Sequence, residues 1–206
     1  MILESVCVGP VEVNCYILAA GIGQRAIIID PGGDEQKIER VLKKYDLKPE
    51  FIINTHGHFD HIACDDKFAV PVYIHREDLA LLKDPKLNLS SFFMSPFSLE
   101  SEIKILQDKE IIELGQIQLE VMHVPGHTPG GIALLLKKPK DKILFTGDTL
   151  FCQGIGRTDF PGADEMLLVE SIKEKLLCLS DDTIIYPGHG PSSTIAEEKK
   201  NNPFLS

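Results

Sequence analysis

Four side chains that can bind a metal ion fall within six residues in the first third of the chain. They are His56, His58, Asp60 and His61, and they directly follow an apolar, β-type run at 51–54. Removing imidazoles and a carboxylate from water at the end of a buried strand costs several kcal/mol unless these groups gain partners. A metal ion supplies such a partner, so the cluster indicates a metal or catalytic site rather than a polar loop that happens to be rich in histidine.

Three more candidate ligands follow predicted strands farther along the chain. His127 follows the predicted strand 117–124, Asp148 follows 143–146, and His189 follows 183–186. Strand ends are where α/β proteins place their site residues. Together the five histidines and two aspartates exceed the roughly three protein ligands that one catalytic zinc needs, so we expect two metal ions. Asp148 is the expected bridge, because a carboxylate has two oxygens and an imidazole only one free lone pair.

The candidate donors are nitrogen and oxygen only, and Cys152 is the one cysteine near these loops. Such donors suit Zn²⁺, Fe or Mn²⁺ and disfavour thiophilic metals, and we expect two divalent ions, zinc first. Two metals about 3.5–4 Å apart can share a water, lower its pKa towards ~7 and polarise a carbonyl. The pattern therefore predicts hydrolysis of an acyl compound by a metal-bound hydroxide, without the G-x-S-x-G motif of serine hydrolases.

Length and composition fit one globular domain. The chain has 206 residues, 43% of them hydrophobic, and we expect a single domain over 1–206. The net charge of −10 argues against nucleic acid and anionic membrane surfaces as partners. The five cysteines are scattered and form no C-x-x-C pair, which is typical of reduced thiols. The N-terminus does not resemble a signal peptide, and no apolar run is long enough to span a membrane. These features predict a cytoplasmic protein. A homodimer is plausible, although no segment argues for it.

The order of the predicted elements is similar in the two halves of the chain. In each half a strand ends at an aspartate, an amphipathic helix follows, and another strand ends at a histidine: Asp30, 34–45 and His56, then Asp148, 164–177 and His189. Two such halves, each a sheet covered by helices, predict an α+β protein with four layers in the order helix, sheet, sheet, helix.

Four motifs, in order along the chain, resemble those of the metallo-β-lactamase superfamily. They are His56-Gly57-His58-Phe59-Asp60-His61, Pro125-Gly126-His127-Thr128-Pro129-Gly130, Thr146-Gly147-Asp148-Thr149-Leu150-Phe151 and Pro187-Gly188-His189-Gly190. The resemblance covers nearly the whole chain. Within the superfamily the chain is most similar to single-domain relatives of glyoxalase II, the hydroxyacylglutathione hydrolases, on the segments 14–16, 30–33 and 156–159.

The resemblance implies an αββα sandwich with the site at one sheet edge. It implies a first metal held by His56, His58 and His127, a second held by Asp60, His61 and His189, and Asp148 as the bridge. Asp60 would also orient the attacking water or carry its proton. The implied substrate is a small acyl-thiol. Because the chain stops soon after His189, we expect it to lack the helical extension with which glyoxalase II binds glutathione. Lactam hydrolysis is not the expected main activity, since lactamases of this superfamily tend to carry cysteine where Asp148 stands.

Two other hypotheses stay open. A sulfur dioxygenase acting on persulfides shares the motifs but uses a single iron, so metal count and oxygen consumption would separate it from a hydrolase. A non-enzymatic metal-binding module would show a lost ligand, and no ligand is missing.

Two residues near the motifs have two interpretations each. Asp30, before the glycine turn at 31–33, either caps that turn or orients a ligating histidine. Arg157 either binds an acidic group of the substrate or forms a salt bridge with Asp159 or Asp164.

The segment 84–100 is the least regular part of the chain and carries an exposed-looking apolar run at 92–94. Long loops without their own periodicity are often functional. The favoured interpretation is a loop folded back on its own aromatic residues, and the alternative is a lid that faces the substrate. His75 and His123 are expected to have structural roles.

Overall fold

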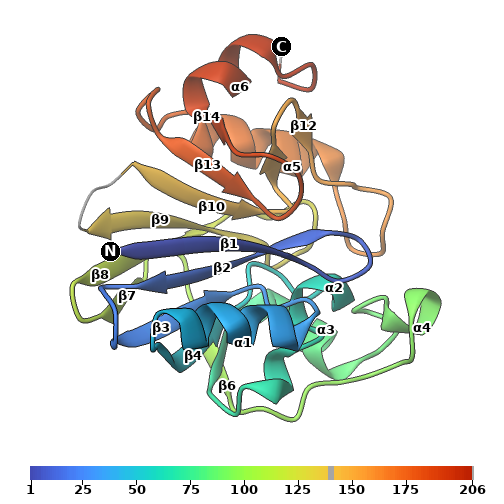
Figure 1. The fold of residues 1–206 in the computed structure, drawn as a ribbon. Helices are drawn as coiled ribbons and strands as arrows, with labels where there is room; N and C mark the ends of the chain where they lie inside the picture. The colour runs from blue at the N-terminus through green and yellow to red at the C-terminus, as the bar shows by residue number, and fades with distance from the viewer. Residues whose placement is uncertain (139–141, 206) are drawn as a thin grey trace.

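Two six-stranded sheets pack face to face in the computed structural model, which describes residues 1–138 and 142–205 (Figure 1). The first sheet follows chain order from β1 to β6, and its strands from β3 onward are parallel neighbours. These strands are β1 Ile2–Val8, β2 Val13–Ala19, β3 Arg25–Ile29, β4 Lys48–Ile53, β5 Val72–His75 and β6 Ile103–Leu106.

The second sheet has the order β14-β13-β10-β9-β8-β7, with β10 and β13 parallel. Its strands are β7 Ile111–Leu114, β8 Ile117–His123, β9 Ile132–Lys138, β10 Ile143–Gly147, β13 Ile184–Pro187 and β14 Ser193–Thr194. A short ribbon, β11 Leu150–Phe151 with β12 Gly154–Ile155, lies beside it. The basic turn that the sequence predicts over 137–142 lies partly outside the described residues.

Helices cover the outer face of each sheet (Figure 1). The first sheet carries α1, α2 and α3, and the second carries α5 and α6, while α4 stands at one end. The helices are α1 Glu35–Lys44, α2 Phe59–Ile62, α3 Leu79–Lys83, α4 Ser90–Phe93, α5 Glu165–Ser171 and α6 Ile195–Asn201. The predicted four-layer αββα sandwich is therefore confirmed.

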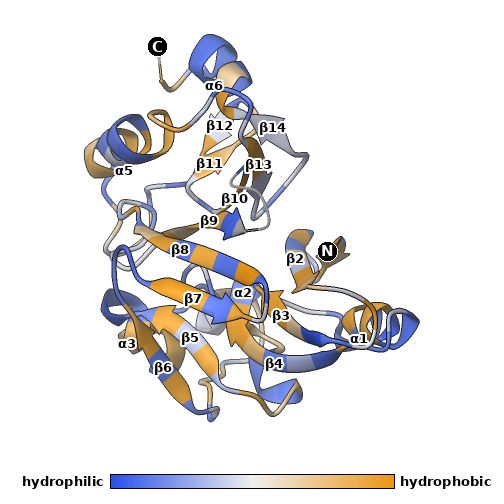
Figure 2. Cartoon of the chain, turned by 90° about the vertical axis from the view of Figure 1, so that its left-hand side faces the viewer, coloured by the Kyte–Doolittle hydropathy of each residue, from blue (hydrophilic) through white to orange (hydrophobic). Residues whose placement is uncertain are grey.

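The strands are apolar because both of their faces are buried. Side chains alternate between faces along a strand, so Ile27 and Ile29 enter the core between the sheets, while Ile28 packs with Ile38 and Leu42 of α1. The same alternation divides the strands of the second sheet between the central core and α5 and α6. Figure 2 shows the largely hydrophobic strands and the hydrophilic outer sides of the helices. Polar chemistry is consequently confined to the strand ends.

The helix predicted over 164–177 is only partly correct. The α-helix ends at Ser171, and Ile172–Leu176 continues as a π-helical turn. Leu168, Ile172 and Leu176 still face the core, because the wider turn keeps the apolar stripe directed at the second sheet.

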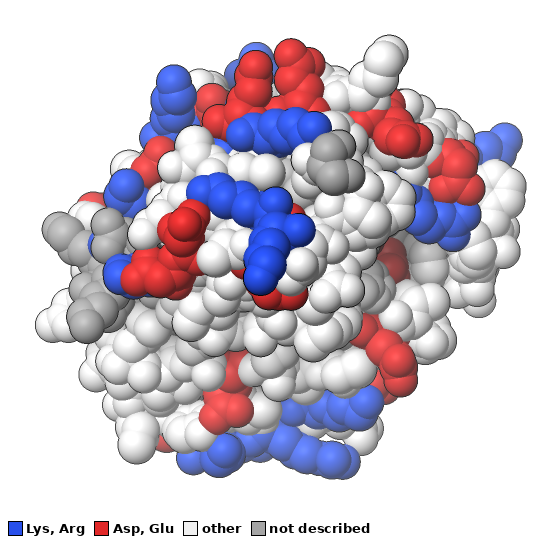
Figure 3. Space-filling model, turned by 90° about the horizontal axis from the view of Figure 1, so that it is seen from above, with Lys and Arg blue, Asp and Glu red and all other residues white. Residues whose placement is uncertain are grey.

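None of the helices in the described ranges is long and apolar enough to cross a bilayer. Basic and acidic side chains are intermixed on the face shown in Figure 3. Such a mixture is typical of a solvated protein surface.

Candidate metal centre

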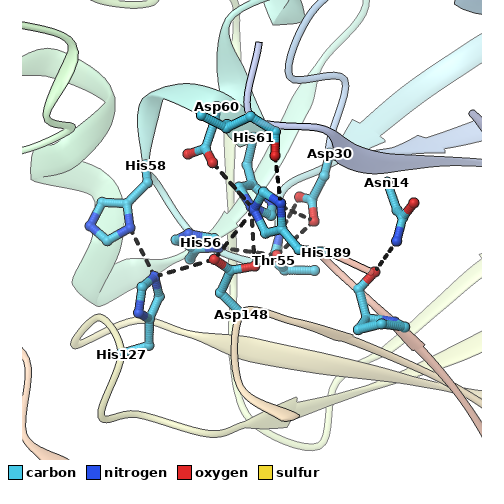
Figure 4. Close-up of polar contacts among 12 residues, drawn as sticks. Asn14, Asp30, Thr55, His56, His58, Asp60, His61, His127, Asp148 and His189 are labelled. Atoms are coloured by element: carbon cyan, nitrogen blue, oxygen red, sulfur yellow. Dashed lines mark hydrogen bonds and ion pairs between the residues drawn. The ribbon is translucent and has the colours of Figure 1, made fainter. Parts of the chain in front are cut away.

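Four loops bring the seven candidate ligands to one edge of the two sheets (Figure 4). The loop after β4 and the short helix α2 supply four of them, and the loops after β8, β10 and β13 supply one each: His56, His58, Asp60 and His61, then His127, Asp148 and His189. His61 is fully buried, and His56, His58 and His127 are at most 4% exposed. The structure thus gathers residues that are up to 133 positions apart, His56 and His189 being the extremes.

The ligand atoms form three groups of three. Two of the groups share no residue, and we call them the first and second triads; the third group, His56, His61 and Asp148, joins the two. The first triad is His56, His58 and His127, and the second is Asp60, His61 and His189; within each, the ligand atoms lie within 4.8 Å of one another.

Asp148 lies between the two triads. One of its oxygens, Oδ1, is 3.3 Å from His61 Nε2. The other, Oδ2, is 3.8 Å from His127 Nε2 and 3.6 Å from His189 Nε2. A single carboxylate therefore faces both groups, which is the placement that a bridging ligand needs.

Several of these atoms are buried without a hydrogen-bond partner among the described residues. They are His56 Nε2, His61 Nε2 and Asp148 Oδ1, the last two of which lie 3.3 Å apart as an ion-pair contact. His58 Nδ1 and His127 Nε2 face each other at 2.9 Å. An unsatisfied buried polar group costs about 1–3 kcal/mol. Nitrogen and oxygen donors that converge in this way fit divalent cations of the zinc, iron or manganese type.

The remaining ring nitrogens of two histidines are held by the backbone. His127 Nδ1 donates to the carbonyl of Arg157 at 2.7 Å, and His189 Nδ1 donates to the carbonyl of Val11 at 3.1 Å. A carbonyl can only accept, so the Nδ1 atoms carry the protons and each Nε2 keeps its lone pair for a metal. The backbone thereby selects the tautomer that can act as a ligand.

Asp30 holds His61 in a comparable way. Its Oδ1 accepts from the amide of Thr55 and its Oδ2 from the Thr55 hydroxyl, each at 2.7 Å. Its Oδ2 also lies 3.0 Å from His61 Nδ1 as an ion-pair contact. Asp30 has a φ of 52°, and a non-glycine residue keeps such a conformation only where its surroundings fix it. The interpretation that Asp30 orients a ligating histidine is supported.

Glycines allow the backbone to pack directly against the site. A Cβ at Gly188 would lie 2.2 Å from Asp148 Oδ1 and 2.8 Å from His61 Cε1. A Cβ at Gly156 would lie 1.9 Å from the carbonyl oxygen of Asp148. Any side chain at these two positions would displace Asp148.

Sequence reasoning missed Asp78, a fully buried residue just before α3. Its carboxylate accepts from the amide of Gly57 at 3.0 Å, the hydroxyl of Thr128 at 2.7 Å and the amide of Gly130 at 2.6 Å. It therefore joins the loop of His58 to the loop of His127, and so sets the spacing of the first triad. No sequence signal marks it, since two of its partners are backbone amides.

The two triads differ in their proton affinity. Burial, followed by the neighbouring histidine charges, lowers the pKa of His56 well below its usual value, and burial and His127 lower that of His58 to about 3. Burial also opposes charge on His61, but the carboxylates of Asp148 and Asp30 outweigh it and raise the pKa of His61 well above its usual value.

A cavity of 330 Å³ opens onto the ligands. It is lined by His58, Asp60, His127, Asp148 and His189 and otherwise mostly by apolar and aromatic side chains. A larger hollow of 620 Å³ lies along the outer side of α5. That hollow contains none of the candidate ligands, so the smaller cavity is the one that matters for chemistry.

Arg157 lines this cavity, and it also forms one of the two salt bridges considered for it. Its Nε and Nη2 donate to the two carboxylate oxygens of Asp159 at 2.9 and 2.7 Å. Its guanidinium lies over the ring of Phe160 at 4.4 Å. Asp164 is engaged elsewhere, because it accepts from the amide of Leu167 at the start of α5.

His75 and His123 lie outside both triads. Their rings stack with centroids 4.0 Å apart. His123 Nε2 donates to the carbonyl of Pro129 at 2.9 Å, which steadies the loop that carries His127. These contacts are those of structural residues.

Comparison with known sequences agrees with this geometry. Residues 8–189 match the family described as the Metallo-beta-lactamase superfamily. The chain is 36% identical to the hydroxyacylglutathione hydrolase GloC of Haemophilus influenzae, over 100% of this chain and 99% of that protein. It is also 36% identical to the probable metallo-hydrolase YqgX of Bacillus subtilis, over 97% of this chain and 95% of that protein.

Two solved structures have the same fold over nearly all of this chain. The BLEG-1 B3 metallo-beta-lactamase aligns with a TM-score of 0.91 and 39% identity, covering 100% of both chains. TTHA1623, solved in a di-iron-bound form, aligns with a TM-score of 0.84 and 33% identity, covering 98% of this chain and 100% of its own.

Metal binding should release more protons at the second triad than at the first. A raised pKa keeps His61 and His189 protonated near pH 6.5, so a metal must displace protons there, while His56 and His58 are already neutral. Calorimetric Zn²⁺ titrations of chelator-treated protein, in buffers of different ionisation enthalpy, measure this. Proton release in the His58→Ala variant reports metal binding at the second triad, and proton release in the His189→Ala variant reports metal binding at the first. Equal proton release from the two variants would contradict the expectation.

Replacing Asp78 with asparagine should weaken metal binding by about 10–100-fold, the usual effect of losing a group that orients ligands. The amide cannot accept from all three donors that the carboxylate satisfies. Competition with a chromophoric chelator measures the affinity. Glu77→Gln removes the same charge one residue away on an exposed side chain and should leave the affinity unchanged. Wild-type affinity in a folded Asp78→Asn protein would show that Asp78 does not set the ligand spacing.

Proposed function

The chain belongs to the metallo-β-lactamase superfamily, and on that premise we propose that it is a metal-dependent thioester hydrolase similar to glyoxalase II, acting on a small acyl-thiol. The observation that carries the proposal is the placement of Asp148 between the two triads, beside an open cavity. Full-length similarity to GloC, named a hydroxyacylglutathione hydrolase, supports the thioester specificity.

We assign the first triad to one divalent ion, the second triad to another, and Asp148 to both. Zinc is the first choice and iron or manganese the alternatives, because the donors are imidazole nitrogens and carboxylate oxygens. The di-iron form of TTHA1623 supports a pair of metals in this fold.

Ions held there would supply a water of lowered pKa and a Lewis acid for the thioester carbonyl. Asp60 lines the cavity, with Oδ2 3.3 Å from His189 Nε2. Burial opposes its ionisation, but the charge of His61 and the hydrogen bond from His189 outweigh burial and lower the pKa of Asp60. The Asp60 carboxylate would accept a proton from the attacking water. The water oxygen then adds to the carbonyl carbon, the C–S bond breaks, and Asp60 returns the proton to the departing thiolate.

Arg157 is the proposed contact for an acidic group on the thiol. Its salt bridge with Asp159 joins two side chains that are 64% and 65% exposed, and such surface pairs contribute about 0–1 kcal/mol. A substrate carboxylate can therefore take the place of Asp159 at little cost.

Hydrolysis of β-lactams is a second candidate, because the BLEG-1 B3 metallo-beta-lactamase is 39% identical over the full length of both chains. The same arrangement of groups would then act on an amide C–N bond. The residue at the bridging position is Asp148 rather than cysteine, so we rank lactams below thioesters.

Elemental analysis and three assays of the purified protein test the function. We expect two divalent metals per chain and hydrolysis of S-lactoylglutathione or simpler thioesters, lost after chelation and restored by added metal. Nitrocefin hydrolysis would favour the lactam alternative, and persulfide-dependent oxygen uptake with one iron would favour the dioxygenase. Thioester turnover by metal-free protein would refute the proposed mechanism.

The Asp148→Ala variant should lose both metals and at least about 100-fold in kcat/KM, since one side chain serves both triads. Metal content by elemental analysis and thioester turnover measure the two effects. The matched control is Asp46→Asn, an exposed position that neither lines the cavity nor belongs to a ligand group, and it should keep both metals. If Asp148→Ala retained two metals, the bridging role would be wrong.

A further inference from the structure

One side of the active-site cavity is an apolar wall, defined here as Phe59, Leu89 and Phe93. We propose that this wall binds the acyl group of the substrate and makes the enzyme selective for apolar acyl chains. The proposal rests on the proposed thioester hydrolysis and adds to it the chemical class of the acyl group.

The wall begins at the metal ligands. Phe59 lies between His58 and Asp60 in the sequence, and all three line the cavity. The rings of Phe59 and Phe93 stack at 5.4 Å with their planes 14° apart. Phe59 is 7% exposed, whereas Phe93 is 59% exposed, so the outer ring still has apolar area to cover. None of the three side chains offers a hydrogen bond or a charge to a polar group.

The wall is fixed to the ligand loop rather than mobile in the manner of a lid. The amide of Phe59 donates to the carbonyl of Asn88 at 2.8 Å. The Asn88 side chain, fully buried, accepts from the amide of Ser90 at 2.9 Å and donates to the carbonyl of Phe97 at 3.0 Å. These bonds hold α4 at a set position relative to the ligands.

The favoured interpretation of the segment 84–100, a loop folded back on its own aromatic residues, is wrong for its apolar run. Phe92, Phe93 and Met94 are 68%, 59% and 42% exposed. Figure 1 shows α4 standing out from the body of the sandwich at the same end as the segment between β12 and α5. Phe93 faces the cavity from this helix, so its exposure leaves it free to contact a bound molecule.

Charge decides which part of the substrate meets the wall. Arg157, on the segment between β12 and α5, is the basic side chain among the cavity-lining residues. A thiol leaves as an anion, and the proposed acidic group on the thiol pairs with this guanidinium, so the thiol part is better placed near Arg157. The acyl group then points to the wall, where burial of apolar area is the available source of binding energy.

The size of the effect follows from the area that each methylene buries. Burying one methylene changes an equilibrium or rate constant by about fourfold. With Phe93 in place, kcat/KM should therefore rise about fourfold for each methylene that reaches the wall. Removing the Phe93 ring should flatten this dependence and raise KM for long chains.

The test uses the metal-loaded full chain and thioesters of N-acetylcysteamine with acetyl, butyryl, hexanoyl and octanoyl groups. We expect a rising series for wild type, a flat one for Phe93→Ala, and a largely restored slope for Phe93→Leu. The matched control is Phe92→Ala, the neighbouring exposed ring that does not line the cavity, and it should keep the wild-type slope. A flat wild-type series, or equal loss of slope in the Phe92→Ala and Phe93→Ala variants, would overturn the proposal.

Binding measurements separate this proposal from the proposed function. Ketone analogues, in which a methylene replaces the thioester sulfur, bind without being cleaved, and calorimetry on the same variants gives their affinities. If affinity rises with chain length and depends on Phe93, but no thioester is turned over, the result would support acyl binding by the apolar wall and refute thioester hydrolysis. Turnover without chain-length dependence would refute the wall alone.

Discussion

Burial of charged and ionisable groups is the constraint on which this structure depends. Five imidazoles and two carboxylates meet at one sheet edge, most of them with little access to water, and each needs a partner there. Part of the need is met by Asp30 and by the carbonyls of Arg157 and Val11. The atoms that these groups do not satisfy, such as His56 Nε2, are the ones that face one another. The protein thus supplies hydrogen-bond partners on the side of each ligand that faces away from the centre, and it leaves the converging donor atoms to bind metal ions.

The sandwich explains why the site lies where it does. Strands such as β3 and β9 are apolar on both faces, so polar groups are tolerated only where the strands end. The two sheets contribute to the same edge, and Asp78 and Asp148 connect loops from both of them. Rigid strands behind short, hydrogen-bonded loops keep the two triads together without help from a flexible segment.

Sequence reasoning recovered the layers and the position of the ligands because residue type and spacing carry that information. His56 and His58 follow an apolar run, and four potential ligands crowded into six residues have few roles besides metal binding or catalysis. It missed Asp78, because hydrogen bonds to backbone amides depend on which loops meet and leave no trace in residue types. It also favoured the wrong interpretation of the run at 92–94, since apolar residues usually turn inward. The hydrogen bonds of the buried Asn88 side chain to Ser90 and Phe97, which fix the start of α4, also leave no pattern in residue types.

His189 ties the end of the chain to its beginning. Its ring donates to Val11, 178 residues away, and its backbone pairs with Val13. A ribosome releases the first hairpin long before His189 emerges, so the second triad is the last part of the centre to assemble. His56, His58 and His127, in contrast, all lie in the first two thirds of the sequence. Residues near both ends of the sequence must therefore be in place before Asp60, His61 and His189 can converge.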